Sequence, residues 1–223
     1  FVGVGWYRTE FDVPQFQAGK RATILFDGAM SHANVYINGQ KVGYWPYGYN
    51  SFHFDITKYL KPGEKNTLAV RLENLPESSR WYPGAGLYRN VHLIITEDAY
   101  IPVWGTYITT PSVNEKFAKV NVRTKVVLPE GADPAKYSVE TSVWNPNKQK
   151  LTAVRTSLAQ MKYNNNQAEQ EFVIQAPSLW SPEMPALYSA ETRLYEGDKL
   201  KDIYTTPFGI RSIEIIPDKG FFL

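Results

Sequence analysis

The sequence has no cysteine, only three histidines and almost no net charge, since 24 Lys and Arg residues are balanced by 22 Asp and Glu residues among 223. Without cysteine there is no disulfide, no thiolate nucleophile and no cysteine-ligated zinc or iron–sulfur site. The net charge of +2 argues against a nucleic-acid partner held by bulk charge. No apolar run approaches the ~20 residues that span a bilayer, so no membrane partner is expected either.

Helical periodicity is also missing, because no stretch of about ten residues repeats apolar side chains at a spacing of 3.6. Period two dominates instead. Val120, Val122 and Thr124 alternate with polar residues, and residues 137–143 do the same, which is typical of strands with one buried face. Further strands are expected at 22–26, 33–37, 41–44, 68–72, 91–95, 151–158, 169–175, 187–196 and 203–216. The pattern predicts an all-β protein.

Two local signals fix details of this prediction. Asn38 and Gly39 separate two alternating segments, and this dipeptide favours a type I′ hairpin turn because both residues adopt positive φ. Asp55 is placed to cap one short helix over residues 56–60, which Pro62 would end.

The chain is long enough for two small β domains. Glu97 and Asp98 follow an apolar strand and precede Pro102, so we place a boundary there. The segment that follows has about seven expected strands, the immunoglobulin-type number. We therefore expect one domain over 1–98, a second over 99–216, and the start of something different over 217–223.

Few residues are arranged for catalysis. His32, His53 and His92 lack metal-ligand spacing, and no GxSxG nucleophile motif is present. Asn114-Glu115 could in principle present a glycosidase acid, but it lies between two expected strands, so a hairpin turn is the better interpretation. We expect no catalytic residue, no metal and no cofactor in this chain.

Aromatic side chains are abundant, at 14% of residues, and many lie in two loops rich in Gly and Pro. The loops are Tyr44–Tyr49 and Ser79–Arg89. Strand alternation does not explain aromatic residues there, and binding groups concentrate in loops on a rigid scaffold. The alternative is that these rings plug the open ends of a sandwich or pack against a neighbouring domain, and the residue types alone favour this packing role over ligand binding.

Several long segments resemble glycoside hydrolase family 2. GWYRTEFDVP (5–14), ILFDGAMSHANVYINGQKVG (24–43), FHFDITKYLKPGEKNTLAVRLEN (52–74) and SRWYPGAGLYRNVHL (79–93) resemble its N-terminal sugar-binding domain. LWSPEMPALYSAETRLYEGDKLKD (179–202) and FGIRSIEIIPDKGFFL (208–223) resemble the end of its immunoglobulin-like domain. Residues 100–178 have little family signature beyond their strand pattern.

This resemblance implies a galactose-binding-like jelly-roll sandwich followed by an immunoglobulin-like sandwich. In the family a (β/α)₈ barrel follows and holds both catalytic glutamates, so residues 217–223 would begin a truncated barrel. A barrel needs ~250 residues, and the chain taken alone is therefore expected to be inactive. Its partners would be the barrel of the same polypeptide, a carbohydrate substrate and further copies in a homo-oligomer.

Family members hydrolyse β-galactosides, β-glucuronides or β-mannosides with retention, and β-galactosidase is the leading expectation for the parent enzyme. The segment matching SRWYPGAGLYR approaches the barrel mouth in the family, which makes Arg80, Trp81 and Tyr82 the candidate substrate-binding residues. The rival hypotheses are an autonomous carbohydrate-binding module and a complete enzyme with an unrecognised site. A periplasmic or secreted bacterial location is expected, with any signal peptide outside this sequence.

Overall fold

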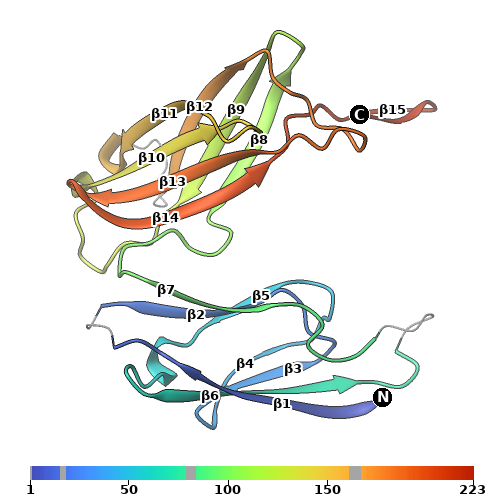
Figure 1. Ribbon diagram of the computed structural model, residues 1–223, viewed down its shortest axis with the longest axis vertical. Coiled ribbons are helices and arrows are strands. Elements are labelled where there is room, and N and C mark those ends of the chain that lie inside the picture. Colours follow the sequence, from blue (N-terminus) through green and yellow to red (C-terminus); the bar gives the residue numbers. More distant parts are fainter. Residues whose placement is uncertain (1, 16–18, 79–83, 161–166) are drawn as a thin grey trace. The chain divides into compact units, whose positions relative to one another are not determined.

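The computed structural model describes residues 2–15, 19–78, 84–160 and 167–223, and the chain divides into two compact units, Phe1–Glu97 and Asp98–Leu223. Both are built from antiparallel strands (Figure 1). In the described part of the chain the helices are 3₁₀ turns of three residues, and no helix is long and apolar enough to cross a membrane. The all-β prediction is confirmed.

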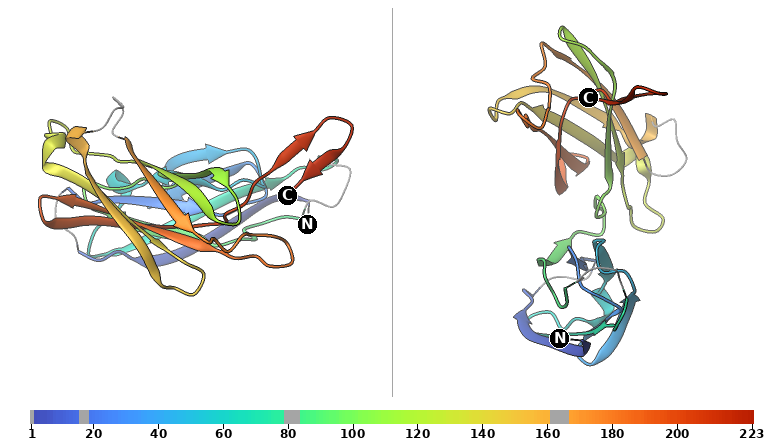
Figure 2. Two further views of the ribbon diagram at one scale, coloured as in Figure 1. Left: turned by 90° about the horizontal axis from the view of Figure 1, so that it is seen from above. Right: turned by 90° about the vertical axis from the view of Figure 1, so that its right-hand side faces the viewer.

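The first unit is a sandwich of a four-stranded and a three-stranded sheet, in the orders β1-β6-β3-β4 and β5-β2-β7 (Figure 2). Its strands are β1 (Gly3–Asp12), β2 (Arg21–Phe26), β3 (Ala33–Ile37), β4 (Gln40–Trp45), β5 (Phe52–Asp55), β6 (Lys65–Asn74) and β7 (Val91–Thr96). Buried and partly exposed residues alternate strictly along β6. This sandwich is the jelly-roll domain.

The core of the first unit is organised around stacked aromatic rings. Phe52 is 2% exposed, and its ring stacks on Phe26 at 4.8 Å and on Trp45 at 5.6 Å between centroids. Phe54 meets the same ring edge-on at 5.7 Å. Trp45 was expected among the loop aromatics, but it ends β4 on the inward side and belongs to this core.

The second unit contains the seven strands expected for an immunoglobulin-like sandwich, in the sheet orders β11-β10-β13-β14 and β12-β9-β8. The strands are β8 (Thr106–Val113), β9 (Phe117–Lys125), β10 (Tyr137–Trp144), β11 (Lys150–Ser157), β12 (Gln167–Gln175), β13 (Tyr188–Glu196) and β14 (Lys199–Phe208). A short hairpin follows, made of β15 (Glu214–Ile216) and β16 (Gly220–Phe222). The turns η2 (Pro134–Lys136) and η3 (Leu158–Gln160) precede and follow the β10–β11 pair.

The alternation that predicted two of these strands matches their burial. Val120, Val122 and Thr124 are buried on one side of β9. Along β10, Tyr137, Val139, Thr141 and Val143 are buried in the same way.

The expected helix over residues 56–60 is wrong in length. The structure has one 3₁₀ turn, η1 (Thr57–Tyr59), in which Asp55 Oδ1 accepts a hydrogen bond from the Thr57 N–H at 2.9 Å. Asn66 then exchanges hydrogen bonds with the backbone of Lys61, which directs the chain into β6. The segment is too short to propagate beyond the costly first turn.

The expected strand over 203–216 is also wrong, because β14 ends at Phe208. The Ile210 carbonyl accepts a hydrogen bond from the Trp180 N–H at 2.8 Å, so the chain pairs with the segment before β13 and leaves the sheet. The guanidinium of Arg211, just beyond the end of β14, lies 4.7 Å from the centre of the Trp180 ring. It is thus held within the second unit by a cation–π contact.

The Asn38-Gly39 turn joins β3 to β4 as expected, with φ of 49° at Asn38 and 81° at Gly39. The Asn38 side chain also binds the Tyr59 carbonyl and the Thr67 N–H. The turn therefore connects the hairpin to β6 as well as closing it.

Gly39→Val should destabilise the first unit by about 1 kcal/mol, because a β-branched residue is strained at positive φ. An added Cβ meets nothing within 4 Å, so backbone strain is the whole effect. Gly39→Asn is the matched control, since Asn tolerates this conformation. Urea unfolding of the three proteins measures the difference, and equal stability of the Val and Asn variants would contradict the turn assignment.

Candidate functional site

Three loops of the first unit converge at one place. They are residues 27–32 after β2, residues 46–51 after β4, and residues 84–90 before β7. Met30 and Gly86 exchange two backbone hydrogen bonds of 3.0 Å, and the His32 N–H donates to the Pro46 carbonyl at 3.1 Å. We call these residues the loop cluster.

Tyr88 is the side chain that joins the two aromatic loops noted in the sequence. Its hydroxyl donates to the Gly48 carbonyl at 2.9 Å, although the two residues are 40 positions apart. The Arg89 guanidinium lies 5.1 Å from the centre of the Tyr88 ring. The hydroxyl of Tyr88 is thus bonded to a peptide carbonyl, and the ring of Tyr88 faces a cation.

Further phenol rings of the loop cluster are open to solvent. Tyr47 and Tyr49 lie edge to face with 5.5 Å between ring centroids, and Tyr47 is 53% exposed. Gly48 between them is buried against Met30. Stacking faces and hydroxyl groups side by side are suited to flat ligands that carry both C–H and O–H groups, such as sugars.

Asp27 is the one carboxylate in residues 27–32, 46–51 and 79–90 of the sequence. Its Oδ2 lies 3.0 Å from Nε2 of His92, and its backbone carbonyl accepts from Ser51 Oγ at 3.1 Å. Glycoside hydrolysis by retention uses two carboxyl groups about 5 Å apart. The loop cluster therefore offers binding groups and lacks such a pair.

Arg80, Trp81 and Tyr82, the predicted substrate-binding residues, lie outside the described residues. The described continuation of their segment, from Gly84 to Arg89, belongs to the loop cluster. Sequence reasoning missed the pairing of Asp27 with His92, whose side chains lie 3.0 Å apart. Only the antiparallel pairing of β2 with β7 brings them together.

Glu115 lies in the tight turn between β8 and β9. Asn114 Oδ1 accepts hydrogen bonds from the N–H groups of Lys116 and Phe117 at 2.8 and 2.9 Å. Asn114 and Glu115 are therefore turn residues of the β8–β9 hairpin, as their position between two expected strands predicted.

Two acidic side chains of the second unit hold the segment that precedes β8. Asp202 accepts hydrogen bonds from the N–H groups of Ile101 and Ile203 at 2.8 and 2.9 Å; burial raises its pKa and outweighs these bonds, which lower it. Burial also raises the pKa of Asp98, but Lys201 at 3.1 Å and the Ala99 N–H outweigh it and lower the pKa overall. Both carboxyl groups are occupied by backbone amides or by Lys201, which is typical of structural anchors.

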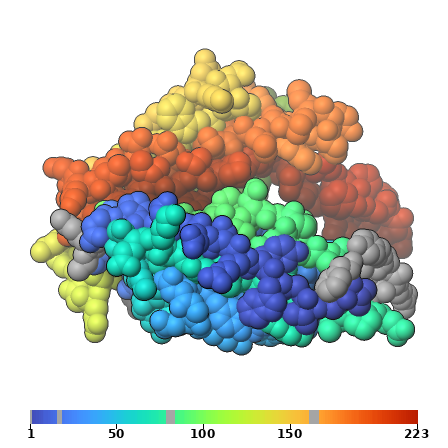
Figure 3. All heavy atoms as spheres, turned by 60° about the horizontal axis from the view of Figure 1, so that its bottom comes forward, coloured from blue at the N-terminus to red at the C-terminus, as the bar shows by residue number. Residues whose placement is uncertain are grey.

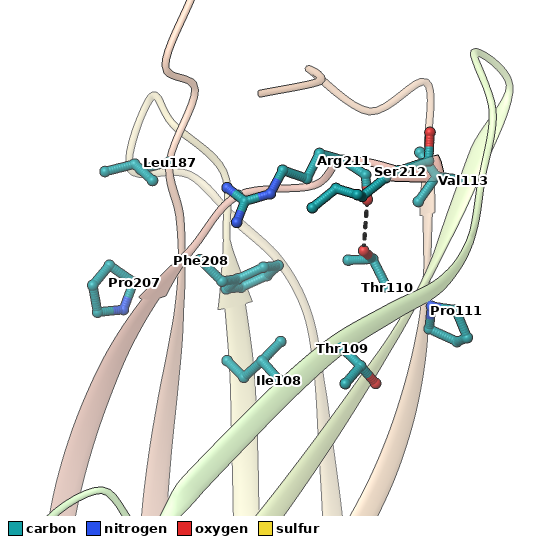
Figure 4. Close-up of a pocket in the computed structure, with 12 residues that line it drawn as sticks. Ile108, Thr109, Thr110, Pro111, Val113, Leu187, Pro207, Phe208, Arg211 and Ser212 are labelled. Carbon is teal, nitrogen blue, oxygen red and sulfur yellow. Dashed lines mark hydrogen bonds between the residues drawn. The ribbon is translucent and has the colours of Figure 1, made fainter. Parts of the chain in front are cut away.

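A cavity of about 680 Å³ lies in the second unit (Figure 4). Thr110 Oγ1 donates to the Arg211 carbonyl at 2.9 Å beside it. Its described lining is mostly apolar and contains no carboxylate or imidazole: Ile108, Thr109, Thr110, Pro111, Val113, Leu187, Pro207, Phe208, Gly209, Arg211, Ser212 and Ile213. Such a lining supports packing rather than acid–base chemistry. Across the described residues, no three His, Asp or Glu side chains gather as a metal site.

Comparison with known proteins matches both units to one family. Residues 1–97 match the profile described as "Glycosyl hydrolases family 2, sugar binding domain", and residues 100–211 match "Glycosyl hydrolases family 2". The match thus covers the middle of the chain, where the sequence carried little signature.

Similar proteins bear two kinds of name. A β-galactosidase of Bacteroides ovatus is 40% identical over 99% of this chain and 26% of its own length. A putative β-glucuronidase of Formosa agariphila is 37% identical over 99% of this chain and 20% of its own length. A crystal structure of a glycosyl hydrolase family 2 member from Bacteroides cellulosilyticus superimposes with a TM-score of 0.88 at 33% identity, covering 100% of this chain and 30% of that one. The chain spans about a quarter of the length of these relatives.

Proposed function

The chain belongs to glycosyl hydrolase family 2, and from this premise we propose that it is the noncatalytic part of a longer retaining glycosidase. In that enzyme it supports a catalytic (β/α)₈ barrel and completes one wall of the substrate pocket. Two facts support the proposal: similar proteins are about four times as long, and the loop cluster presents binding groups without a carboxyl pair.

The observation that carries the proposal is the convergence of three loops on Tyr88 and Gly48. Loops fixed on a rigid sandwich are suited to present rings and donors to a ligand held by another domain. Arg80, Trp81 and Tyr82 come shortly before Gly84 in the sequence, where the described part of this loop begins. We assign them to contact with the sugar or the barrel, because a guanidinium offers a planar fork of donors and an indole offers a stacking face.

We propose a β-galactoside as substrate, because a relative with 40% identity is named a β-galactosidase. β-Glucuronidase and β-mannosidase remain alternative parent activities, and the putative β-glucuronidase with 37% identity supports the former. The proposal includes an exported location and a homo-oligomeric complete enzyme.

The test compares this 223-residue chain with the longer polypeptide encoded with it, using 4-nitrophenyl β-galactoside, β-glucuronide and β-mannoside. The chain alone should give no turnover above a mock preparation, and the longer polypeptide should hydrolyse the galactoside fastest. In the longer polypeptide, Arg80→Ala should lower kcat/KM about tenfold or more, because hydrogen bonds from charged groups are the strong ones.

Arg123→Ala is the matched control, since Arg123 is an exposed arginine of β9 near Glu169. It should leave kcat/KM unchanged. Turnover by the chain alone would contradict the noncatalytic assignment. Millimolar or tighter sugar binding by the chain alone, abolished by Trp81→Ala, would favour an autonomous carbohydrate-binding module.

A further inference from the structure

The edge strand β1 of the first unit is more exposed than its neighbour in the same sheet. β1 is the outermost strand of the four-stranded sheet, and within the described residues it pairs only with β6. Buried residues alternate along β6, whereas the five successive residues Trp6–Glu10 of β1 are all exposed. Side chains on both faces of this stretch are therefore open to solvent. A long, exposed edge of this kind is a template for pairing with another strand.

The inward face of β1 is open as well. Tyr7 is 41% exposed, although Val70, its partner on β6, is completely buried. A cavity of about 200 Å³ lies beside this pair, and it is lined by Tyr7, Arg8, Thr9, Leu68, Val70 and Leu87. Figure 3 shows β1 in dark blue on the side of the first unit turned toward the viewer. The core is thus closed at β6, and β1 lacks an apolar neighbour on its outer side within the described residues.

The charges of β1 make the strand complementary to a second copy of itself. Arg8 and Glu10 are separated by Thr9, so they point to the same face of the sheet. A two-fold axis at Thr9 places Arg8 of each copy opposite Glu10 of the partner subunit. Glu10 also lies 3.9 Å from Lys65, but both side chains are more than 60% exposed. Contacts of that kind are weak, so Glu10 remains available to a second cation.

The same axis pairs aromatic side chains on the other face. Directly opposite residues of an antiparallel pair point to the same side of the sheet. With the axis at Thr9, Tyr7 of each copy lies opposite Phe11 of the partner subunit. Aromatic pairs across strands stabilise antiparallel sheets. Both faces of β1 therefore gain favourable pairs in one register.

Neighbouring registers are less favourable. An axis at Arg8 or at Glu10 places two like charges directly opposite each other, which destabilises a pair of strands. An axis at Phe11 places Glu10 opposite Asp12 of the partner subunit, again with like charge. An axis at Tyr7 forms no ion pair. Among these centres, Thr9 alone combines two ion pairs with two aromatic pairs.

We propose that two copies of this chain associate by antiparallel pairing of their β1 strands about a two-fold axis at Thr9. The two four-stranded sheets then become continuous. The occupant is a second copy, because the order of Arg8 and Glu10 complements itself in an antiparallel copy. The pairing gives a surface and a symmetry to the homo-oligomer included in the proposed function, and it rests on that part of the proposed function alone.

The first test uses Thr9→Cys, which carries a single thiol because the chain has no cysteine. Opposite Cα atoms of an antiparallel pair lie about 4.5–5.5 Å apart, within the range that a disulfide spans. Oxidation with copper phenanthroline should convert most of this variant to a covalent dimer on non-reducing electrophoresis. Tyr7→Cys is the matched control on the same strand. In the proposed register the two Tyr7 positions lie about 14 Å apart, so this variant should remain monomeric on the gel.

The second test exchanges the charges. In sedimentation equilibrium the unmodified chain should dimerise with a Kd of about 100 μM or tighter. Arg8→Glu and Glu10→Arg should each raise this Kd about tenfold or more, because each places like charges opposite one another at two positions. The double variant Arg8→Glu/Glu10→Arg should restore the original Kd. Arg123→Glu, on β9 of the second unit, is the control and should leave the Kd unchanged. Circular dichroism confirms that each variant is folded.

Three outcomes would overturn the proposal. The first is a chain that stays monomeric in sedimentation. The second is a dimer that tolerates both single charge reversals, because another surface would then hold it. The third is a Tyr7→Cys protein that forms the covalent dimer as readily as Thr9→Cys. These measurements involve no sugar and no turnover, so failure of the dimer leaves the noncatalytic assignment standing, and turnover by the chain alone leaves the dimer standing.

Discussion

Phe52→Ala should lower the free energy of unfolding of the first unit by about 3–5 kcal/mol, the usual cost of removing a buried phenylalanine. Phe52 is 2% exposed and touches the rings of Phe26, Trp45 and Phe54. Its removal leaves a cavity that stacked aromatic neighbours cannot fill without leaving their positions. Chemical denaturation measures the loss, and hydrogen exchange locates it within residues 1–97.

Phe172→Ala is the matched control for this experiment. Phe172 is 3% exposed and belongs to the core between the two sheets of the second unit. The two units have separate cores. The Phe172→Ala variant should therefore lose protection of its backbone amides from hydrogen exchange within residues 98–223 instead. A Phe52→Ala protein that loses less than about 1 kcal/mol would contradict the stacked core.

The strands were predictable because they depend on the alternation of apolar and polar residues among neighbouring positions. Alternation along residues 120–126 and 137–143 places one set of side chains in the core, and the structure buries that set. The turn at Asn38-Gly39 was predictable for the same reason, since two adjacent residues determine its backbone conformation. Both predictions needed only neighbouring positions.

The errors arose where a distant partner decides the outcome. β14 ends at Phe208 because the Ile210 carbonyl binds the Trp180 N–H, and no pattern within residues 203–216 reveals that bond. Trp45 lies in a stretch rich in Gly and Pro, yet its ring stacks in the core because Phe52 is there to receive it. In both cases a tertiary contact outweighed the local pattern.

The loop cluster shows the same limit. The sequence identified both aromatic loops, but their contact rests on a bond between Tyr88 and Gly48. The partners become neighbours only after β2 has paired with β7 and with β5, because these pairings bring residues 27, 52 and 91 to the same end of the sheet. The sequence therefore predicted which residues belong to the site, whereas the strand pairing determines how these residues are arranged.

Gly48→Val should destabilise the first unit by about 1–3 kcal/mol and separate the two aromatic loops, because it overpacks their junction. A Cβ at this position would lie 2.3 Å from Met30 Sδ and 3.1 Å from the Met30 backbone Cα. Met30 cannot retreat easily, since two hydrogen bonds tie its backbone to Gly86. Denaturant unfolding gives the stability, and hydrogen exchange of residues 84–90 reports the separation of the loops.

Gly5→Ala is the control for a glycine substitution in the same unit, because the nearest atom to its added Cβ is 3.9 Å away. It should change stability little. A second comparison tests the crowding directly: Gly48→Ala should be less damaging in a Met30→Ala background than alone, since the side chain that it strikes is gone. If the losses of unfolding free energy in this double-mutant cycle were strictly additive, a side chain at position 48 would not collide with Met30. That result would contradict the crowding that we infer at the junction of the two aromatic loops.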